Sequence, residues 1–352
     1  MRFELSEDQQ LLRQSTRDVL SSECPLEKSR AIMEHEPRGY DAALWARLAE
    51  MGYLGLTVPT TAGGQGLGAI ELAIVLEEMG RACVPGPYLD VMLAAAVLAT
   101  SRGQAQALGA LVEGKKLITI ARHDHPFSGD TPTASAVRAE GGRLRGSKYF
   151  VPFAAAADAL VITTADALWL ASGPFETVPL PTLDVAQRFG KVTFDQPATR
   201  LLPAAALERI DQLAAVGAAA ALLGIMSRCL EMTLDYLRTR QAFKRPIGAF
   251  QALQHRMADM LLKTESTRSA VYRAAWCLDN GDSGTAVACA AAKAYAGDAA
   301  RLVCGETIQM HGGIGFTWEL DVHLYFKRAK TLEQHYGSTA VQLERALAAA
   351  GI

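Results

Sequence analysis

The strongest constraint on the fold is a series of five apolar-periodic segments that follows residue 204. They cover residues 207–240, 249–280, 284–310, 319–332 and 339–350. Small residues recur on the face of these segments that would point inward, and long helices of this kind pack side by side in a bundle. The sequence therefore predicts a helical bundle over residues 204–352.

A second helical region opens the chain. Ser6 and Gln9 stand in the positions of a capping box, and the helix that they start is expected to end near Cys24 and Pro25. Further helices are predicted at residues 41–51, 71–81, 90–102 and 104–113. We therefore expect a helical domain over residues 1–114.

The stretch between these two regions is β-like and is interrupted by many prolines. Strands are predicted at residues 117–121, 134–139, 146–151, 159–164 and 192–194, with a hairpin turn at Gly141 and Gly142. This gives a middle domain over residues 115–203. The chain as a whole is predicted to be α+β and mostly α.

Composition excludes several classes of function. The 352 residues carry a net charge of −2 without a basic run, so the chain offers no surface for nucleic acid or for an anionic membrane. The most apolar window, residues 213–226, is rich in alanine and glycine and predicts a buried core helix, not a membrane span. Six scattered cysteines without a C-x-x-C pair predict no metal site. The amino terminus lacks a signal-peptide layout, so we expect a cytoplasmic protein.

Two short motifs stand near the ends of predicted helices. Gln309 is followed by His311, Gly312 and Gly313, and residues 240–251 read RQAFKRPIGAFQ. Glycine lets the backbone approach a flat or anionic ligand closely, and a glutamine amide offers both a donor and an acceptor. Taken alone, a helix C-cap at Gly312 with a tight turn is the simpler interpretation of the first motif.

Together the two motifs resemble the carboxy-terminal domain of the acyl-CoA dehydrogenase family of flavoproteins. The family patterns are R-x-x-F-G-x-P-I-G-x-F-Q and Q-x-x-G-G-x-G-[FY], and residues 146–151 and 157–161 are similar to its middle domain. The resemblance implies a helical amino-terminal domain, a middle β-barrel and a carboxy-terminal four-helix bundle. It also implies FAD, an acyl-CoA thioester as substrate, an electron-acceptor flavoprotein as partner, and a tetramer.

In that family the matching residues lie against the FAD of a neighbouring subunit. The resemblance assigns this role here to Arg240, Phe243, Gln251, Gln309, Gly312 and Gly313. Arg240 would pair with the pyrophosphate, and Phe243 would pack on the cofactor. A solvated arginine at a helix end is the alternative for Arg240. Lys244 departs from the family, which usually has glycine there.

The base of the family is missing from its usual place. Dehydrogenation beside a thioester needs a carboxylate to remove the α proton. Most members carry a glutamate where this chain has Tyr336, and a phenol, with a reference pKa of about 10, is a poor base. Other members carry the base at the position of Ala214. Asp211 lies three residues before Ala214 and is a weak candidate base, although an acid that complements a helix dipole is the simpler interpretation.

The histidines are not assigned a catalytic role. His311 and His335 are predicted to be partly exposed residues at helix ends.

The segments that hold a subunit's own flavin have also changed. In the family pattern T-E-x-x-x-G-S-D, only Ser128, Gly129 and Asp130 remain faintly similar. The flavin-ring motif W-[IV]-[ST] appears as residues 150–152, and Pro152 has neither a hydroxyl nor an N–H to donate. The residues that would reach a neighbour's flavin are thus better preserved than those that would hold the chain's own.

This uneven pattern suggests a partner subunit. Some bacterial relatives, including those that act on steroid side chains joined to CoA, are heteromers in which one subunit carries the base and the other completes the FAD pocket. The chain resembles the second kind. Two alternatives remain open: a catalytically silent, flavin-free structural subunit, and a homomeric enzyme with a displaced base such as Asp211.

Overall fold

The computed structural model describes residues 4–125 and 136–352. These residues divide into two compact units. The helical unit contains the chain up to Glu27, Ala69–Val84 and Ala215–Ile352, and the sheet unit contains Lys28–Gly68 and Pro85–Ala214. The sequence predicts three domains, at residues 1–114, 115–203 and 204–352. The division into two units does not test these domains, which stay a prediction.

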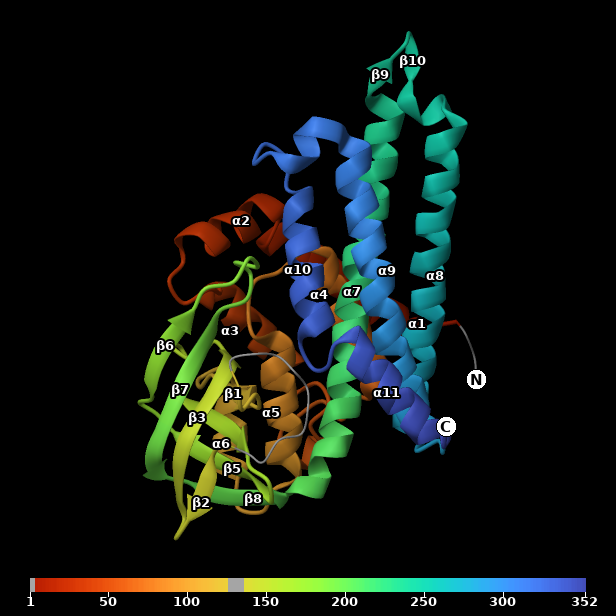
Figure 1. The fold of residues 1–352 in the computed structure, drawn as a ribbon. Helices are drawn as coiled ribbons and strands as arrows, with labels where there is room; N and C mark the ends of the chain where they lie inside the picture. The colour runs from red at the N-terminus through yellow and green to blue at the C-terminus, as the bar shows by residue number, and fades with distance from the viewer. Residues whose placement is uncertain (1–3, 126–135) are drawn as a thin grey trace. The chain divides into compact units, whose positions relative to one another are not determined.

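Long helices make up the helical unit (Figure 1). They are α1 (Glu7–Glu23), α4 (Ala69–Arg81), α7 (Leu207–Thr239) from Ala215 onward, α8 (Gln251–Asn280), α9 (Thr285–His311), α10 (Val322–Gln334) and α11 (Thr339–Ala350), with the hairpin of β9 (Gln241–Ala242) and β10 (Arg245–Pro246) and the 3₁₀ turns η4 (Ile247–Ala249) and η5 (Gly312–Phe316). The predicted carboxy-terminal helices are confirmed within a few residues. The capping box is also confirmed, since Ser6 Oγ accepts from the Gln9 N–H at 3.2 Å and Gln9 Oε1 accepts from the Ser6 N–H at 3.0 Å.

Helix α7 contains a long apolar window. Among the described residues, α7 with the turn before it is long and apolar enough to cross a membrane, but 83% of its most apolar window is buried inside the structure. The predicted window at residues 213–226 is buried throughout. It therefore forms a core helix, as the sequence predicts.

The sheet unit combines short helices with two four-stranded sheets. Its helices are α2 (Leu26–His35, with its first two residues in the helical unit), α3 (Ala42–Glu50), α5 (Tyr88–Thr100) and α6 (Ala105–Val112), with the 3₁₀ turns η1 (Tyr53–Gly55), η2 (Thr60–Ala62) and η3 (Ala204–Ala206). One sheet has the order β1 (Ile118–Ala121), β4 (Ala159–Thr163), β5 (Ala167–Ser172), β8 (Thr199–Pro203); the other has the order β2 (Arg138–Glu140), β3 (Arg143–Pro152), β7 (Phe189–Pro197), β6 (Glu176–Leu180). Only the β1–β4 pair is parallel among these neighbours.

Both sheets contribute side chains to one hydrophobic cluster, which includes Leu144, Ile162, Trp169 and Phe194. The resemblance implies a β-barrel, but the described strands form two separate sheets without closing. The edge strands β1 and β8 of one sheet pair with no strand of the other. The shared cluster makes the two sheets layers around one core.

Sequence reasoning misses α2 and the strands β5, β6 and β8. Pro25 ends α1, but it also directly precedes α2, whose first N–H groups are unpaired in any case. Pro179 lies in β6 and Pro203 lies in β8. Both strands lie at sheet edges, where a missing donor is tolerated.

Helices α4 and α7 cross in direct backbone contact. A Cβ added at Gly224 on α7 would lie 1.8 Å from the carbonyl oxygen of Glu77 on α4, and a Cβ at Gly80 would lie 2.1 Å from that of Ala221. Real Cβ atoms do not approach an oxygen so closely. The crossing therefore depends on glycine at both positions.

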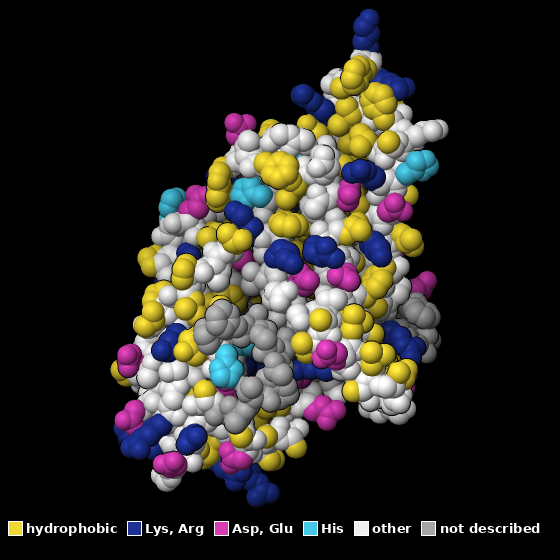
Figure 2. Space-filling view, in the orientation of Figure 1, with side chains coloured by type: hydrophobic (Ala, Val, Ile, Leu, Met, Phe, Trp, Pro, Cys, Tyr) yellow, Lys and Arg dark blue, Asp and Glu magenta, His cyan; other side chains and the backbone are white. Residues whose placement is uncertain are grey.

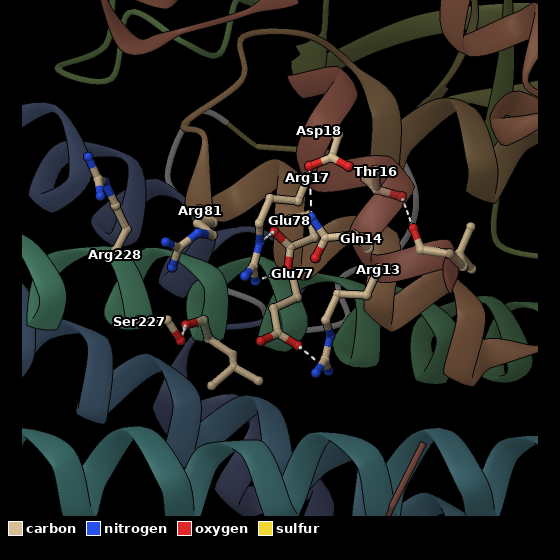
Figure 3. A network of polar contacts seen from close by, with 12 residues as sticks. Arg13, Gln14, Thr16, Arg17, Asp18, Glu77, Glu78, Arg81, Ser227 and Arg228 are labelled. Carbon is tan, nitrogen blue, oxygen red and sulfur yellow. Dashed lines mark hydrogen bonds and ion pairs between the residues drawn. The ribbon is translucent and has the colours of Figure 1, made fainter. Parts of the chain in front are cut away.

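A buried carboxylate ties further helices to this crossing (Figure 3). Glu77, with a side chain 5% exposed, accepts from Arg268 Nη1 at 2.5 Å and from the Tyr272 hydroxyl at 2.7 Å, and Arg13 Nη2 lies 3.6 Å away. Burial raises the pKa of Tyr272, and Glu77 adds to the effect, so its hydroxyl remains a donor. One carboxylate thus joins α1, α4 and α8.

Replacing Gly224 by Ala is expected to lower the free energy of unfolding by roughly 1–3 kcal/mol, because the new methyl group would push α4 and α7 apart. Denaturant unfolding followed by circular dichroism measures this. Gly305→Ala on α9 is the control, since a Cβ there would meet only a Phe326 ring atom at 4.0 Å; it should be neutral or slightly stabilising. Equal stability of the two variants would contradict the close crossing.

Candidate flavin-contact site

Helices α7 and α9 are held in register by three paired contacts. The Sγ atoms of Cys229 and Cys304 lie 3.8 Å apart, and Thr233 Oγ1 donates to Thr307 Oγ1 at 3.2 Å. One helical turn further on, the ring of Tyr236 stacks on that of His311 with centroids 4.4 Å apart. The residue numbers rise together on both helices, so α7 and α9 run parallel and finish at the same end of the helical unit.

The residues that the resemblance assigns to a neighbour's flavin gather at this end. Arg240 follows α7, Gln251 starts α8, and Gln309 lies near the end of α9. All six assigned residues are exposed. Phe243 is 88% exposed and belongs to the turn of the hairpin of β9 and β10 (Figure 1). The structure brings them together on a surface; their role stays a prediction.

This surface fits FAD chemically. Among the described residues no acidic side chain pairs with Arg240, which leaves its guanidinium available for a phosphate. A Cβ built at Gly312 or Gly313 would meet no atom within 4 Å, so a ligand can approach the backbone there. Gly312 also has a φ of 66°, which favours glycine. FAD offers a diphosphate and flat rings to such a set of groups.

His311 is buried, and the prediction that it is partly exposed is wrong. Its side chain packs back between α9 and α7, where Nδ1 lies 2.7 Å from the Thr307 carbonyl oxygen. Burial lowers the pKa of His311, and the hydrogen bond to Thr307 opposes this only in part. The neutral ring can donate Nδ1–H to the carbonyl and stack on Tyr236. His335 is partly exposed, as predicted.

The segment that would hold the chain's own flavin does not fit that role. Pro152 ends β3, and its carbonyl oxygen accepts from Thr119 Oγ1 at 2.9 Å. Pro152 has no N–H, so this position cannot donate to a flavin nitrogen. Ser128, Gly129 and Asp130 lie outside the described residues. Within the described part, the flavin-ring motif therefore lacks its expected donor.

Nearby on β3, a buried lysine is used for structure. Lys148 is fully buried, and its ammonium donates to Asp124 Oδ1 at 2.8 Å and to Thr163 Oγ1 at 3.1 Å. Burial lowers its pKa, although Asp124 opposes the shift. These contacts tie β3 to β4 and to the segment after β1.

Asp211, the weak candidate base, is committed to an ion pair. Its Oδ1 lies 2.5 Å from Arg122 Nη2, and both side chains are largely buried. The guanidinium of Arg122 therefore occupies one oxygen of the Asp211 carboxylate. Ala214, the alternative base position, is fully buried and has no functional group.

Tyr336 is buried in a turn whose backbone is held by two buried side chains. Its φ is 63°, and its carbonyl oxygen accepts from Gln342 Nε2 at 2.7 Å. The fully buried Lys293 donates to the carbonyl oxygens of Glu333 and Gly337 at 2.9 and 3.1 Å. Sequence reasoning misses Lys293, because a lysine in an alanine-rich helix gives no local signal of such a distant contact.

Comparison with known proteins finds two family models that match parts of the chain. Residues 6–114 match the model of the acyl-CoA dehydrogenase N-terminal domain, and residues 204–351 match that of the acyl-CoA dehydrogenase C-terminal domain. A curated relative, acyl-CoA dehydrogenase IpdE2 of Mycolicibacterium smegmatis, is 35% identical over 97% of this chain and 98% of its own.

Solved structures agree with this match. The Tcur3481–Tcur3483 steroid ACAD has a TM-score of 0.90 and 29% identity over 98% of both chains. The ChsE4–ChsE5 complex from Mycobacterium tuberculosis has a TM-score of 0.90 and 28% identity over 100% of this chain and 99% of that chain. Both similar structures are complexes named for two components.

Loss of the His311 imidazole is expected to remove part of the pH dependence of stability. Its folded pKa lies below that of an unfolded histidine, so its contribution is present above the unfolded value of about 6.5 and is lost as pH falls through the folded value. Wild type should therefore lose more stability than His311→Phe between pH 7 and pH 5. His335→Phe is the control, and denaturant unfolding at each pH is the measurement. Parallel pH profiles for wild type and His311→Phe would contradict the buried neutral ring.

Proposed function

This chain belongs to the acyl-CoA dehydrogenase family, and we propose that it is the subunit of a heteromeric enzyme that completes the FAD site of a base-carrying partner. The complex would oxidise an acyl-CoA thioester to its α,β-unsaturated product. An electron-acceptor flavoprotein would then reoxidise the cofactor. We place this complex in the cytoplasm and expect a tetramer.

The exposed end of the helical unit is the observation that carries the proposal. Arg240, Phe243 and Gln309 lie on a surface of one chain, with open glycines beside them. Groups that served a flavin of the same chain would be expected to line a pocket inside it. Exposed groups with this chemistry are suited to a cofactor that another subunit carries.

Three positions at which the family carries its base or a flavin donor have lost these groups in this chain, which supports a base-carrying partner. Tyr336 stands in place of the usual glutamate, Ala214 carries no acid, and Pro152 cannot donate to a flavin. In the complex, the partner's carboxylate would remove the α proton. FAD, when bound, supplies the acceptor for the hydride that leaves the β carbon. This chain's part is to bind and orient the cofactor.

The names of two similar structures point to a substrate class. One is called a steroid ACAD, and both are two-component complexes. We therefore propose a CoA thioester attached to a steroid or to a steroid fragment.

Arg240→Ala is expected to weaken FAD binding to the two-subunit complex by about tenfold or more, because a charge-assisted contact to phosphate is lost. The chain is purified alone and together with an acyl-CoA dehydrogenase subunit encoded beside it. Visible spectra and native masses are then recorded. The proposal expects colourless protein alone and a yellow tetramer with the partner.

Arg301→Ala is the matched control, since Arg301 is also exposed in this unit but pairs with Asp298 on α9. It should retain flavin. Unchanged flavin in the Arg240 variant would remove the assignment of Arg240. A yellow tetramer from the chain alone would favour the homomeric alternative, and a colourless complex would favour the flavin-free structural subunit.

Asp211→Asn is expected to leave the turnover of the complex nearly unchanged, because the base is supplied by the partner. The variant loses the charge of the Arg122 ion pair, so its thermal stability should fall slightly. Steady-state kinetics and thermal unfolding are measured together. Loss of turnover by several orders of magnitude with the fold intact would make Asp211 the base and would support a homomeric enzyme.

A further inference from the structure

The hairpin of β9 and β10 is closed by only two residues. Arg245 pairs with Ala242 across the hairpin, which leaves Phe243 and Lys244 as the turn. Both turn residues have positive φ, 52° for Phe243 and 63° for Lys244. Two-residue turns of this hand suit the twist of a hairpin, but they favour asparagine and glycine because a larger side chain crowds the backbone.

Lys244 therefore stands in a strained position. The family usually has glycine there, which would adopt the same φ without strain. Strained residues persist where the surrounding structure or a function depends on them. This turn is exposed, so little of its own chain holds it in place. From this backbone strain we infer that the turn contacts a molecule outside the chain.

The charges around the turn are of one sign. Arg238, Arg240, Lys244 and Arg245 are all exposed, and among the described residues none of them pairs with an acid. Arg245 instead lies over the ring of Phe250, 4.2 Å from its centroid. Figure 2 shows Lys and Arg side chains next to hydrophobic ones over this hairpin. The tip of the helical unit thus attracts an anion.

The aromatic ring and the cation of the turn together favour one kind of anion over another. Phe243 precedes Lys244 in the turn and is exposed, with its ring edge to face with that of Phe250 at a centroid distance of 6.0 Å. A ligand that joins flat rings to a diphosphate matches both groups at once. A carboxylate on a protein surface would use the cations but would leave the ring without a flat partner. The turn is therefore better suited to a dinucleotide than to an acidic protein patch.

We propose that Lys244 is a second phosphate-binding cation, which acts with Arg240 on the diphosphate of the FAD that the partner subunit carries. The inference rests on the proposed function and adds to it a residue that the family pattern lacks. Lys244 would offset its strain by this contact and would make FAD binding to the complex more sensitive to salt.

The test compares Lys244→Gly with Lys244→Arg in the two-subunit complex. Glycine suits the turn, so the hairpin remains intact, and arginine retains the charge. The dissociation constant of FAD is measured by flavin fluorescence at low and high salt. We expect Lys244→Gly to bind FAD about tenfold more weakly and with less salt dependence, while Lys244→Arg stays within about twofold of wild type. Inorganic pyrophosphate should slow FAD rebinding to the wild-type apo complex more than to the glycine variant.

Other outcomes separate this inference from the function on which it rests. Unchanged FAD affinity in Lys244→Gly would overturn the assignment of Lys244, and if Arg240→Ala still releases flavin, the proposed function stands. Weaker assembly of the flavin-free complex with unchanged FAD affinity would show that Lys244 contacts an acidic surface of the partner, which also overturns the inference. If neither Lys244→Gly nor Arg240→Ala affects flavin binding, the assignment of Arg240 is removed together with that of Lys244.

Discussion

The helical unit depends on the direct backbone contact between α4 and α7. Because Gly80 and Gly224 lack Cβ atoms, the two helices come close enough to bury Glu77 between its neighbours. A buried carboxylate is tolerated only when donors reach it, and here α8 and α1 supply Arg268, Tyr272 and Arg13. The close contact and the charge network therefore require each other. They fix α7, and α7 in turn sets the register of α9 through Cys229, Thr233 and Tyr236.

The elements that sequence reasoning predicts are those with strong local signals. The capping box at Ser6 and the long alanine-rich helices are determined by residues close in sequence. The edge strands β6 and β8 are not predicted. Each contains a proline, which a strand tolerates only at the edge of a sheet, and whether a strand lies at an edge is decided by the arrangement of the whole sheet. The expected barrel came from a resemblance, whereas the described strands form two sheets around one core.

The candidate site divides in the same way. The motif from Arg240 to Gln251 and the glycines after Gln309 are visible in the sequence, and α7 and α9 carry them to one end of the unit. The burial of His311 could not be predicted, because it follows from a stack with Tyr236 on another helix. The ion pair of Asp211 with Arg122 is equally distant in sequence. Local sequence patterns thus identify candidate site residues, whereas contacts with residues distant in sequence determine whether each side chain is buried, paired or exposed.

The turn at Tyr336 shows why a scaffold outlasts the base that the family places on it. Lys293 is fully buried, and its ammonium is stable there only because the carbonyls of Glu333 and Gly337 accept its hydrogen bonds. A change in that turn would leave a buried charge without partners. The side chain at position 336, in contrast, takes no part in these backbone contacts, so it can change from an acid to a phenol without disturbing them. The shape of the turn therefore depends on these buried contacts and not on the side chain at position 336.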